Sequence, residues 1–139
     1  MKKLNCILLI DDNVDDNFFH TLVIKEADAA EQIKTATDGQ KALEYLENTK
    51  VDPIQYPFPD LIFLDINMPL FNGFEFLEKA REKKCFEDRK PIIVMLTGSF
   101  NPNDEQTAKE RFSNEIKDYK IKPLTIEMLK EIIDRFFYP

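Results

Sequence analysis

Cysteine is scarce in this sequence, and its scarcity excludes two classes of protein. Cys6 and Cys85 are the only two cysteines in 139 residues, and they lie far apart in the chain. Two isolated cysteines cannot build a disulfide framework or a Cys-x-x-Cys metal or redox site. We therefore expect two reduced thiols, as in a cytoplasmic protein.

Long apolar runs are also lacking. The first ten residues, MKKLNCILLI, combine two lysines with an apolar stretch, but that stretch is too short for a signal peptide and Asp11 and Asp12 end it. No segment approaches the roughly 18 apolar residues of a membrane span. The sequence predicts a cytoplasmic protein that does not enter a membrane.

An excess of positive charge is missing as well. The 26 acidic and 19 basic residues give a net charge of −7, with no cluster of lysine and arginine. A negative surface repels phosphates, so DNA and RNA are not expected partners. The length suits one domain, and no linker or repeat divides it. We expect residues 1–139 to form a single domain with no second, output domain.

Short apolar runs alternate with longer stretches of helical periodicity. The predicted strands are 4–10, 33–37, 60–65, 92–97 and 117–121. The predicted helices are 15–29, 40–47, 73–84, 102–112 and the segment that follows Thr125. Strands that are apolar on both faces indicate a parallel sheet covered by helices, and the charged run 117–121 indicates an edge strand. The pattern predicts an α/β fold of the (βα)5 type, in which helices cover both faces of a five-stranded, doubly wound parallel sheet in three layers.

Helical periodicity also predicts the buried faces of the helices. In the first helix it favours Phe18, Phe19, Leu22, Val23 and Ala27. In the last helix it favours Ile126, Leu129, Ile132, Ile133 and Phe136. His20, the only histidine, falls within the first helix, where we interpret it as a structural or partner-facing residue. In the Pro-rich segment 49–60, Tyr56 and Phe58 are expected to anchor the loop, although a partner-binding patch is an alternative.

Three aspartates follow predicted strands. Asp11 and Asp12 end the first strand, and Asp65 ends the third. Parallel strands point their carboxyl ends at one rim of the sheet, so these side chains converge if the two strands are neighbours. Two carboxylates about 4 Å apart repel by roughly 4 kcal/mol at an effective dielectric of about 20. One aspartate could be a solvated helix cap, but three at matching strand ends favour a shared cation, and oxygen ligands favour Mg²⁺.

Two further strand ends carry suitable chemistry. The fourth strand ends on Thr97, and the fifth is followed by Lys122 and Pro123. A hydroxyl and an ammonium beside three carboxylates and a cation form an environment suited to phosphoryl transfer.

Four motifs in order resemble the receiver domain of two-component response regulators, the CheY-like family, over nearly the whole chain. These are IDDN, LDINMPLFNG, LTG and KIKPL. The resemblance implies a flavodoxin-like sheet with the strand order 2-1-3-4-5. It also implies that Asp65 is the nucleophile that takes a phosphoryl group from a sensor histidine kinase. It also implies that Mg²⁺ is held by Asp11, Asp12, Asp65 and the backbone carbonyl of Asn67. Lys122, with a cis bond to Pro123, would pair with the phosphoryl oxygens.

The same resemblance implies a conformational switch. Thr97 would move to hydrogen-bond the phosphoryl group, and Tyr119 would turn inward when it does. Such a domain is not an enzyme acting on external substrates, since it catalyses only its own phosphotransfer and dephosphorylation. Its partners would be a sensor histidine kinase or phosphotransfer protein and a downstream effector at the face of the fourth helix, last strand and last helix. A homodimer is a further candidate assembly.

Three other functions use related folds or chemistry. A phosphohydrolase of the haloacid-dehalogenase type needs an acidic residue two positions after the nucleophile, where this chain has Asn67. A flavin-binding protein would need a phosphate loop after the first strand, where the acidic residues would repel phosphate. A phosphorylation-independent receiver-like interaction module is the remaining alternative.

Overall fold

The computed structural model of the chain describes residues 3–138, so residues 1, 2 and 139 of the predicted domain range lie outside the described residues. The strands are β1 (Leu4–Ile10), β2 (Ala30–Ala36), β3 (Leu61–Leu64), β4 (Ile92–Thr97) and β5 (Ile116–Ile121). The helices are α1 (Val14–Glu26), α2 (Gly39–Val51), α3 (Gly73–Glu82), α4 (Pro102–Arg111) and α5 (Ile126–Phe137). In the described part of the chain, no helix has the length and apolar character needed to span a membrane.

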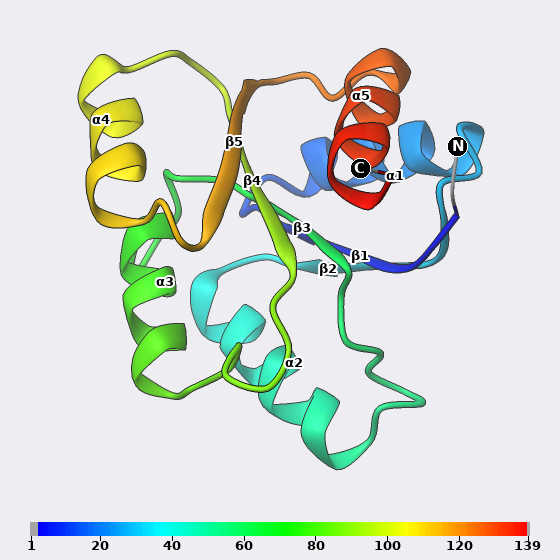
Figure 1. The fold of residues 1–139 in the computed structure, drawn as a ribbon, viewed down its shortest axis with the longest axis horizontal. Helices are drawn as coiled ribbons and strands as arrows, with labels where there is room; N and C mark the ends of the chain where they lie inside the picture. The colour runs from blue at the N-terminus through cyan, green and yellow to red at the C-terminus, as the bar shows by residue number, and fades with distance from the viewer. Residues whose placement is uncertain (1–2, 139) are drawn as a thin grey trace.

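The strands form one parallel sheet in the order β2-β1-β3-β4-β5, with helices alternating along the chain (Figure 1). This confirms the predicted fold class and strand order. β5 lies at one edge, as its charged alternation indicated, and β2 lies at the other. Because all the strands are parallel, the segments that follow them emerge at one rim of the sheet.

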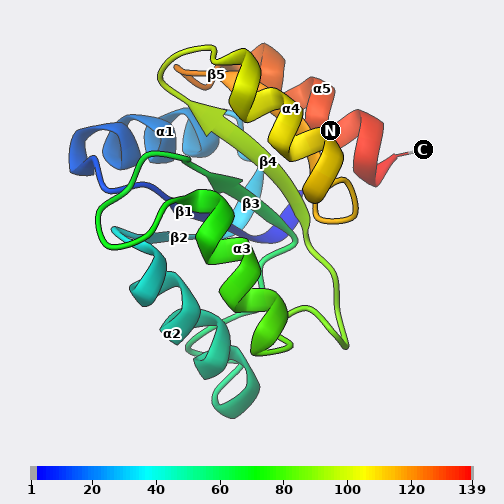
Figure 2. The ribbon, with the colours of Figure 1, turned by 90° about the vertical axis from the view of Figure 1, so that its left-hand side faces the viewer.

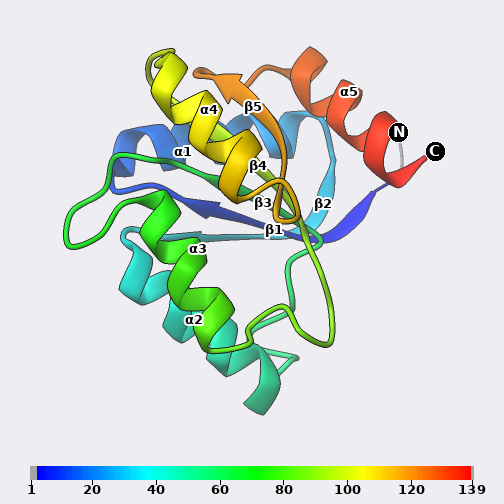
Figure 3. The same cartoon turned by 60° about the vertical axis from the view of Figure 1, so that its left-hand side comes forward.

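Successive strand residues point to opposite faces, and each face has its own core. Leu8, Ile62 and Met95 pack with residues of α2, α3 and α4, whereas Leu9, Phe63 and Val94 pack with residues of α1 and α5. Figures 2 and 3 show α2 and α3 on the opposite side of the sheet from α1 and α5. The result is the predicted three-layer arrangement, with the central strands β1, β3 and β4 covered on both faces.

Each helix begins at a polar residue that caps its free backbone N–H groups. The N-caps are Asn13, Asp38, Asn72, Asn101 and Thr125, and each side chain accepts a hydrogen bond from a backbone N–H of the first turn. Asn72 and Glu75 form a reciprocal capping box at the start of α3. These caps fix the start of each helix close to the strand that precedes it.

Several element boundaries differ from the sequence prediction, and those of β2 and α2 differ for physical reasons. β2 begins at Ala30 rather than at residue 33, since its polar first residues pair with β1 from Leu4 onward. An edge strand needs backbone partners more than apolar side chains, which is why its hydropathy did not reveal the start. α2 continues to Val51 rather than residue 47, and Thr49 is still buried in its last turn.

The buried face predicted for α1 is wrong for three of its five residues. Phe18, Phe19 and Leu22 are 65%, 49% and 48% exposed, whereas Val23 is buried and Ala27 is partly buried. The residues that α1 buries are Asn17, His20, Val23 and Ile24. The structural interpretation of His20 thus agrees with its burial.

The Pro-rich segment 49–60 is anchored by its aromatic side chains. Tyr56 packs edge-on against Tyr45, and Phe58 packs edge-on against Phe86. The guanidinium of Arg89 lies 4.9 Å from the centre of the Phe58 ring. Both rings are partly buried, which favours the anchoring role over a free partner-binding patch.

Candidate functional site

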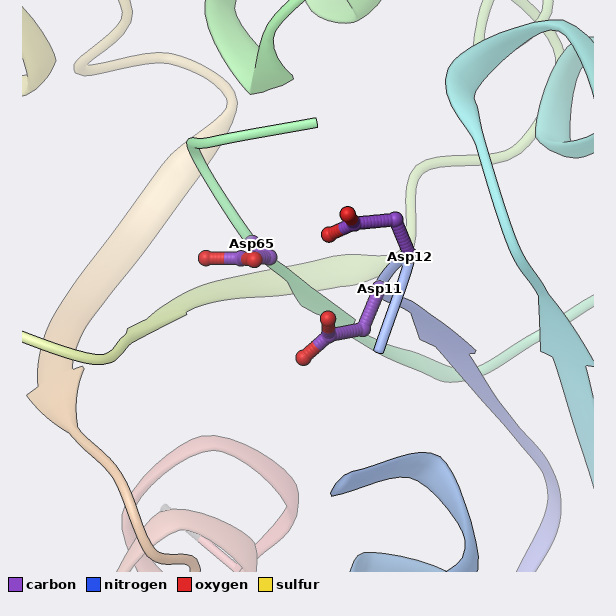
Figure 4. A group of neighbouring side chains, drawn as sticks. All are labelled: Asp11, Asp12 and Asp65. Atoms are coloured by element: carbon purple, nitrogen blue, oxygen red, sulfur yellow. The ribbon is translucent and has the colours of Figure 1, made fainter. Parts of the chain in front are cut away.

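Asp11, Asp12 and Asp65 lie together at the carboxyl ends of β1 and β3 (Figure 4). One carboxylate oxygen of each residue lies within 4.8 Å of one from each of the others. The backbone N–H of Asp65 donates to the carbonyl of Ile10 at 2.9 Å, so the pairing of β1 with β3 sets this proximity. The structure therefore brings the three predicted aspartates into one cluster.

Asp65 is a buried carboxylate with one comparatively free oxygen. The residue is 6% exposed, and its Oδ1 accepts a hydrogen bond of 2.9 Å from the backbone N–H of Ile66. Oδ2 faces Lys122, whose Nζ lies 3.6 Å away. Burial and the nearby charge of Asp11 raise the pKa of Asp65 to about 6, although Lys122 opposes this shift. Burial and Asp11 thus destabilise the anionic form of Asp65 more than Lys122 alone stabilises it.

Lys122 supplies a positive charge to this cluster. Its backbone N–H donates to the carbonyl of Thr97 at 2.7 Å, and its peptide bond to Pro123 is cis, as the resemblance implied. Its Nζ lies 2.6 Å from Asp11 Oδ2 and 2.8 Å from Asp16 Oδ2. Burial lowers the pKa of this ammonium, but the hydrogen bonds to the two carboxylates outweigh it and leave the pKa above its usual value. Lys122 is therefore firmly cationic.

Gly73 allows the segment after Asp65 to fold back onto the site. Its N–H donates to the carbonyl of Ile66 at 2.8 Å. A Cβ at this position would lie 2.5 Å from the backbone oxygen of Asp65, too close for any side chain. The glycine of the LDINMPLFNG motif is thus required by backbone contact.

Thr97 and Tyr119 lie on neighbouring strands. Thr97 is 1% exposed at the end of β4, and its only hydroxyl contact among residues 3–138 is a long 3.5 Å hydrogen bond to the carbonyl of Ser99. Tyr119 pairs with Met95 in the β4–β5 register and packs edge-on against Phe100. A weakly held hydroxyl can change partner easily, but the switching roles of both residues stay predictions.

The donor set suits a hard divalent cation. It contains only carboxylate oxygens, from Asp11, Asp12 and Asp65, and it lies at an open rim where waters can complete a coordination sphere. Asp11 and Asp65 are both buried, so their negative charges repel each other, and a bound cation would relieve this repulsion. Asn67 is exposed two residues after Asp65, and the participation of its carbonyl stays a prediction.

Sequence reasoning missed three polar residues of α1 that reach this site. Asp16 pairs with Lys122, and the side-chain Nδ2 of Asn17 donates to the carbonyl of Asp11 at 2.8 Å. His20 is 3% exposed and lines a cavity of about 10 Å³ together with Asp11 and Asp65. Burial lowers the pKa of His20. The sequence places Asp16 in the first turn of the helix that follows the first strand, but nothing local to that turn indicates its contact with Lys122.

The chain is similar in sequence to known signalling proteins. Residues 7–134 match the family model described as the response regulator receiver domain. A probable cyclic di-GMP phosphodiesterase of Vibrio cholerae is 35% identical over 124 residues, covering 89% of this chain and 24% of that protein. The sensor histidine kinase TmoS of Ectopseudomonas mendocina is 31% identical over 125 residues, covering 89% of this chain but 11% of the kinase. The chain thus spans a quarter or less of the length of these two relatives.

A solved structure of the same size is also similar. The crystal structure of a two-component response regulator from Cytophaga hutchinsonii superposes with a TM-score of 0.87 at 29% sequence identity. The superposition covers 99% of this chain and 100% of that one.

Proposed function

Because the chain belongs to the family of response regulator receiver domains, we propose that it is a phosphorylation-dependent switch of a two-component system. The observation that supports this most is the meeting of three carboxylates and one ammonium at the rim formed by the ends of β1, β3 and β5. The family is of the signalling type rather than a conventional enzyme. We propose that its chemistry is limited to phosphorylation and dephosphorylation of its own Asp65.

The proposed reaction begins with Asp65 as nucleophile. An oxygen of its carboxylate attacks the phosphorus of a phosphohistidine, so that a P–O bond forms and the P–N bond breaks. The electron pair stays on the imidazole nitrogen, which takes a proton from solvent. The product is an acyl phosphate, which splits phosphoryl transfer into two easier steps. Later attack by water breaks the P–O bond, releases inorganic phosphate and restores the carboxylate.

The surrounding residues would stabilise the charge that develops. The ammonium of Lys122 lies close enough to Asp65 to meet a phosphoryl oxygen, and its high pKa keeps it charged. Asp11, Asp12, Asp65 and the carbonyl of Asn67 would hold Mg²⁺. When bound, Mg²⁺ would act as a Lewis acid that neutralises phosphoryl oxygens.

The signal is proposed to leave through Thr97 and Tyr119. A phosphoryl group adds negative charge and acceptor oxygens beside Thr97, whose present hydrogen bond is long. Movement of Thr97 would open space for Tyr119 to turn inward. Tyr119 also lines a groove of about 370 Å³ between α4 and β5, together with Ala108, Ile116 and Arg135. This supports the α4–β5–α5 face as the docking surface for a downstream protein, or for a second copy in a homodimer.

The proposed phosphoryl donor is a sensor histidine kinase or a phosphotransfer protein, which would place the reaction in the cytoplasm. One similar protein is itself a sensor histidine kinase, which supports kinase partners in general. A phosphorylation-independent interaction module is the second candidate. Such a module would not need three carboxylates and an ammonium together at one rim, so the switch is the better-supported function.

Intact-mass measurement tests the proposal. Wild type and Asp65→Asn are incubated with acetyl phosphate, with Mg²⁺ or with a chelator. We expect a phosphoryl adduct that requires Mg²⁺ and is absent from the variant. Asp15→Asn is a suitable control, because it makes the same chemical change at an exposed residue with no ion pair among the described residues. Absence of an adduct from wild type, under conditions that label another receiver domain, would favour the interaction module.

A further inference from the structure

The Lys122 ammonium has three carboxylate neighbours with different roles. An ammonium carries three N–H donors. Nζ donates a hydrogen bond to Asp16 Oδ2 at 2.8 Å and forms an ion pair with Asp11 Oδ2 at 2.6 Å. Asp65 Oδ2 lies farther away, at 3.6 Å, which leaves the third donor available for a group attached to Asp65.

Two of these neighbours would change when the proposed reaction proceeds. Asp11 belongs to the cluster that would hold a cation, and a carboxylate oxygen bound to a cation is a weaker partner for an ammonium. Asp65 would become an acyl phosphate, so its free oxygen would be lost. Asp16 lies on α1, outside that cluster, and undergoes neither change.

The backbone that carries Asp16 is well fixed. Its own N–H donates to Oδ1 of the N-cap residue Asn13 at 3.0 Å. The next residue, Asn17, is buried, and its Nδ2 donates to the carbonyl of Asp11 at 2.8 Å. The first turn of α1 is therefore attached both to its own cap and to the end of β1. A carboxylate on this turn is a stable anchor for a lysine with a flexible four-carbon stem.

We propose that Asp16 is a positioning residue, which holds the Lys122 ammonium beside Asp65 while Asp11 and Asp65 are engaged. This inference rests on the proposed function, and it assigns Asp16 no contact with the phosphoryl group itself. The side chain of Asp16 is 36% exposed, but that of Lys122 is only 14% exposed. The burial of Lys122 therefore distinguishes this contact from an ordinary surface ion pair. An ammonium with so little contact with water depends on its protein partners.

The test compares Asp16→Asn with Asp15→Asn. Both substitutions remove one negative charge from the first turn of α1, but Asp15 is exposed and has no ion pair among the described residues. With acetyl phosphate and saturating Mg²⁺, we expect Asp16→Asn to label about tenfold more slowly than Asp15→Asn, since small misplacements of a reacting group slow reactions strongly. The donor concentration for half-maximal rate should change little. Asp16→Glu should recover most of the rate.

A second readout is independent of phosphorylation. The ¹H–¹⁵N signal of the Lys122 ammonium reports how fast its protons exchange with water, and hydrogen bonds slow that exchange. Wild type and Asp15→Asn should keep slow exchange when Mg²⁺ is added, whereas Asp16→Asn should lose it. Equal exchange and equal labelling rates in the two Asn variants would overturn the proposal. If wild type is not labelled at all, the proposed function fails, and ammonium exchange still decides whether Asp16 anchors Lys122.

Discussion

Helices α1 and α5 cover the same face of the sheet, yet they bury different kinds of side chain. α5 buries an apolar stripe of Leu129, Ile132 and Ile133. α1 buries the polar residues Asn17 and His20 in its first half and the apolar Val23 and Ile24 in its second. The apolar residues Phe18 and Leu22 of α1 face solvent instead.

The difference follows from where each helix begins relative to the site. The first half of α1 lies beside Asp11, whose carbonyl accepts a hydrogen bond from Asn17. Lys122 and Asp65 lie on the same rim, so a polar inner face meets charged groups there. The buried residues of α5 instead belong to the hydrophobic cluster that contains Leu9, Phe63 and Val94. The buried face of α5 therefore serves packing alone, whereas that of α1 serves both packing and the site.

The largest expected effect is on the α5 side of the comparison. Leu129→Ala should lower the free energy of unfolding by about 2–5 kcal/mol, because Leu129 is fully buried and its truncation leaves a cavity. Urea unfolding followed by circular dichroism measures the change. The labelling rate of the folded fraction should match wild type. A loss below about 1 kcal/mol would mean that α5 contributes less to the core than its burial indicates.

A smaller effect is expected at the polar inner face of α1. Asn17→Leu removes the hydrogen bond to the Asp11 carbonyl and leaves that buried carbonyl without its partner. We expect the free energy of unfolding to fall by about 1–3 kcal/mol. The unpaired carbonyl costs more than the burial of an apolar leucine side chain gains.

The same variant should also bind Mg²⁺ more weakly than wild type, because Asp11 would lose the contact that fixes its backbone. Titration calorimetry measures this affinity. A variant that is more stable and binds Mg²⁺ normally would show that the polar residue serves neither packing nor the site.

His20→Leu makes the inner face of α1 resemble that of α5. Burial lowers the pKa of His20, so the folded state binds its proton less tightly than the unfolded state does. Nearby Asp16 and Asp11 favour the protonated form and Lys122 opposes it. Stability contributed by neutral His20 is therefore present above its unfolded pKa of about 6.5 and is lost as pH falls below it.

The expected result is a difference that depends on pH. The two proteins should differ by less than about 1.5 kcal/mol near pH 7.5, as for a change between side chains of similar volume. Below about pH 6.5 the variant should lose less stability than wild type, which urea unfolding at a series of pH values measures. Parallel curves for the two proteins would show that His20 does not titrate differently in the folded state.

These features differ in how far the sequence could predict them. Asp11, Asp65 and Thr97 each follow an apolar run, so strand ends and their shared rim were predictable from local pattern. The ion pair between Asp16 and Lys122 joins residues 106 positions apart, and no local pattern contains it. The sheet order has to be known before α1 can be placed beside the end of β5.

The buried face of α1 could not be predicted for another reason. Residues Phe18, Phe19, Leu22, Val23 and Ile24 place apolar side chains nearly all around the helix, so periodicity alone does not choose a face. The choice is made by polar contacts of Asn17 and Asp16 with the site, which a hydropathy pattern scores as unfavourable for burial. Among the described residues, α5 makes no ion pair or side-chain hydrogen bond to the site, and its stripe was predicted correctly.

The smallest expected effect is the matched truncation on α1. Leu22→Ala removes the same atoms as Leu129→Ala, but Leu22 is 48% exposed and keeps much of its contact with water in the folded state. The truncation therefore removes less buried apolar area than at Leu129, and alanine favours a helix at least as well as leucine. We expect a change within about 0.5 kcal/mol in the free energy of unfolding, measured beside Leu129→Ala.

A loss as large as that of Leu129→Ala would mean that Leu22 is covered in solution. Dependence of that loss on protein concentration would then identify the cover as a second copy of the chain, since only association makes stability depend on concentration.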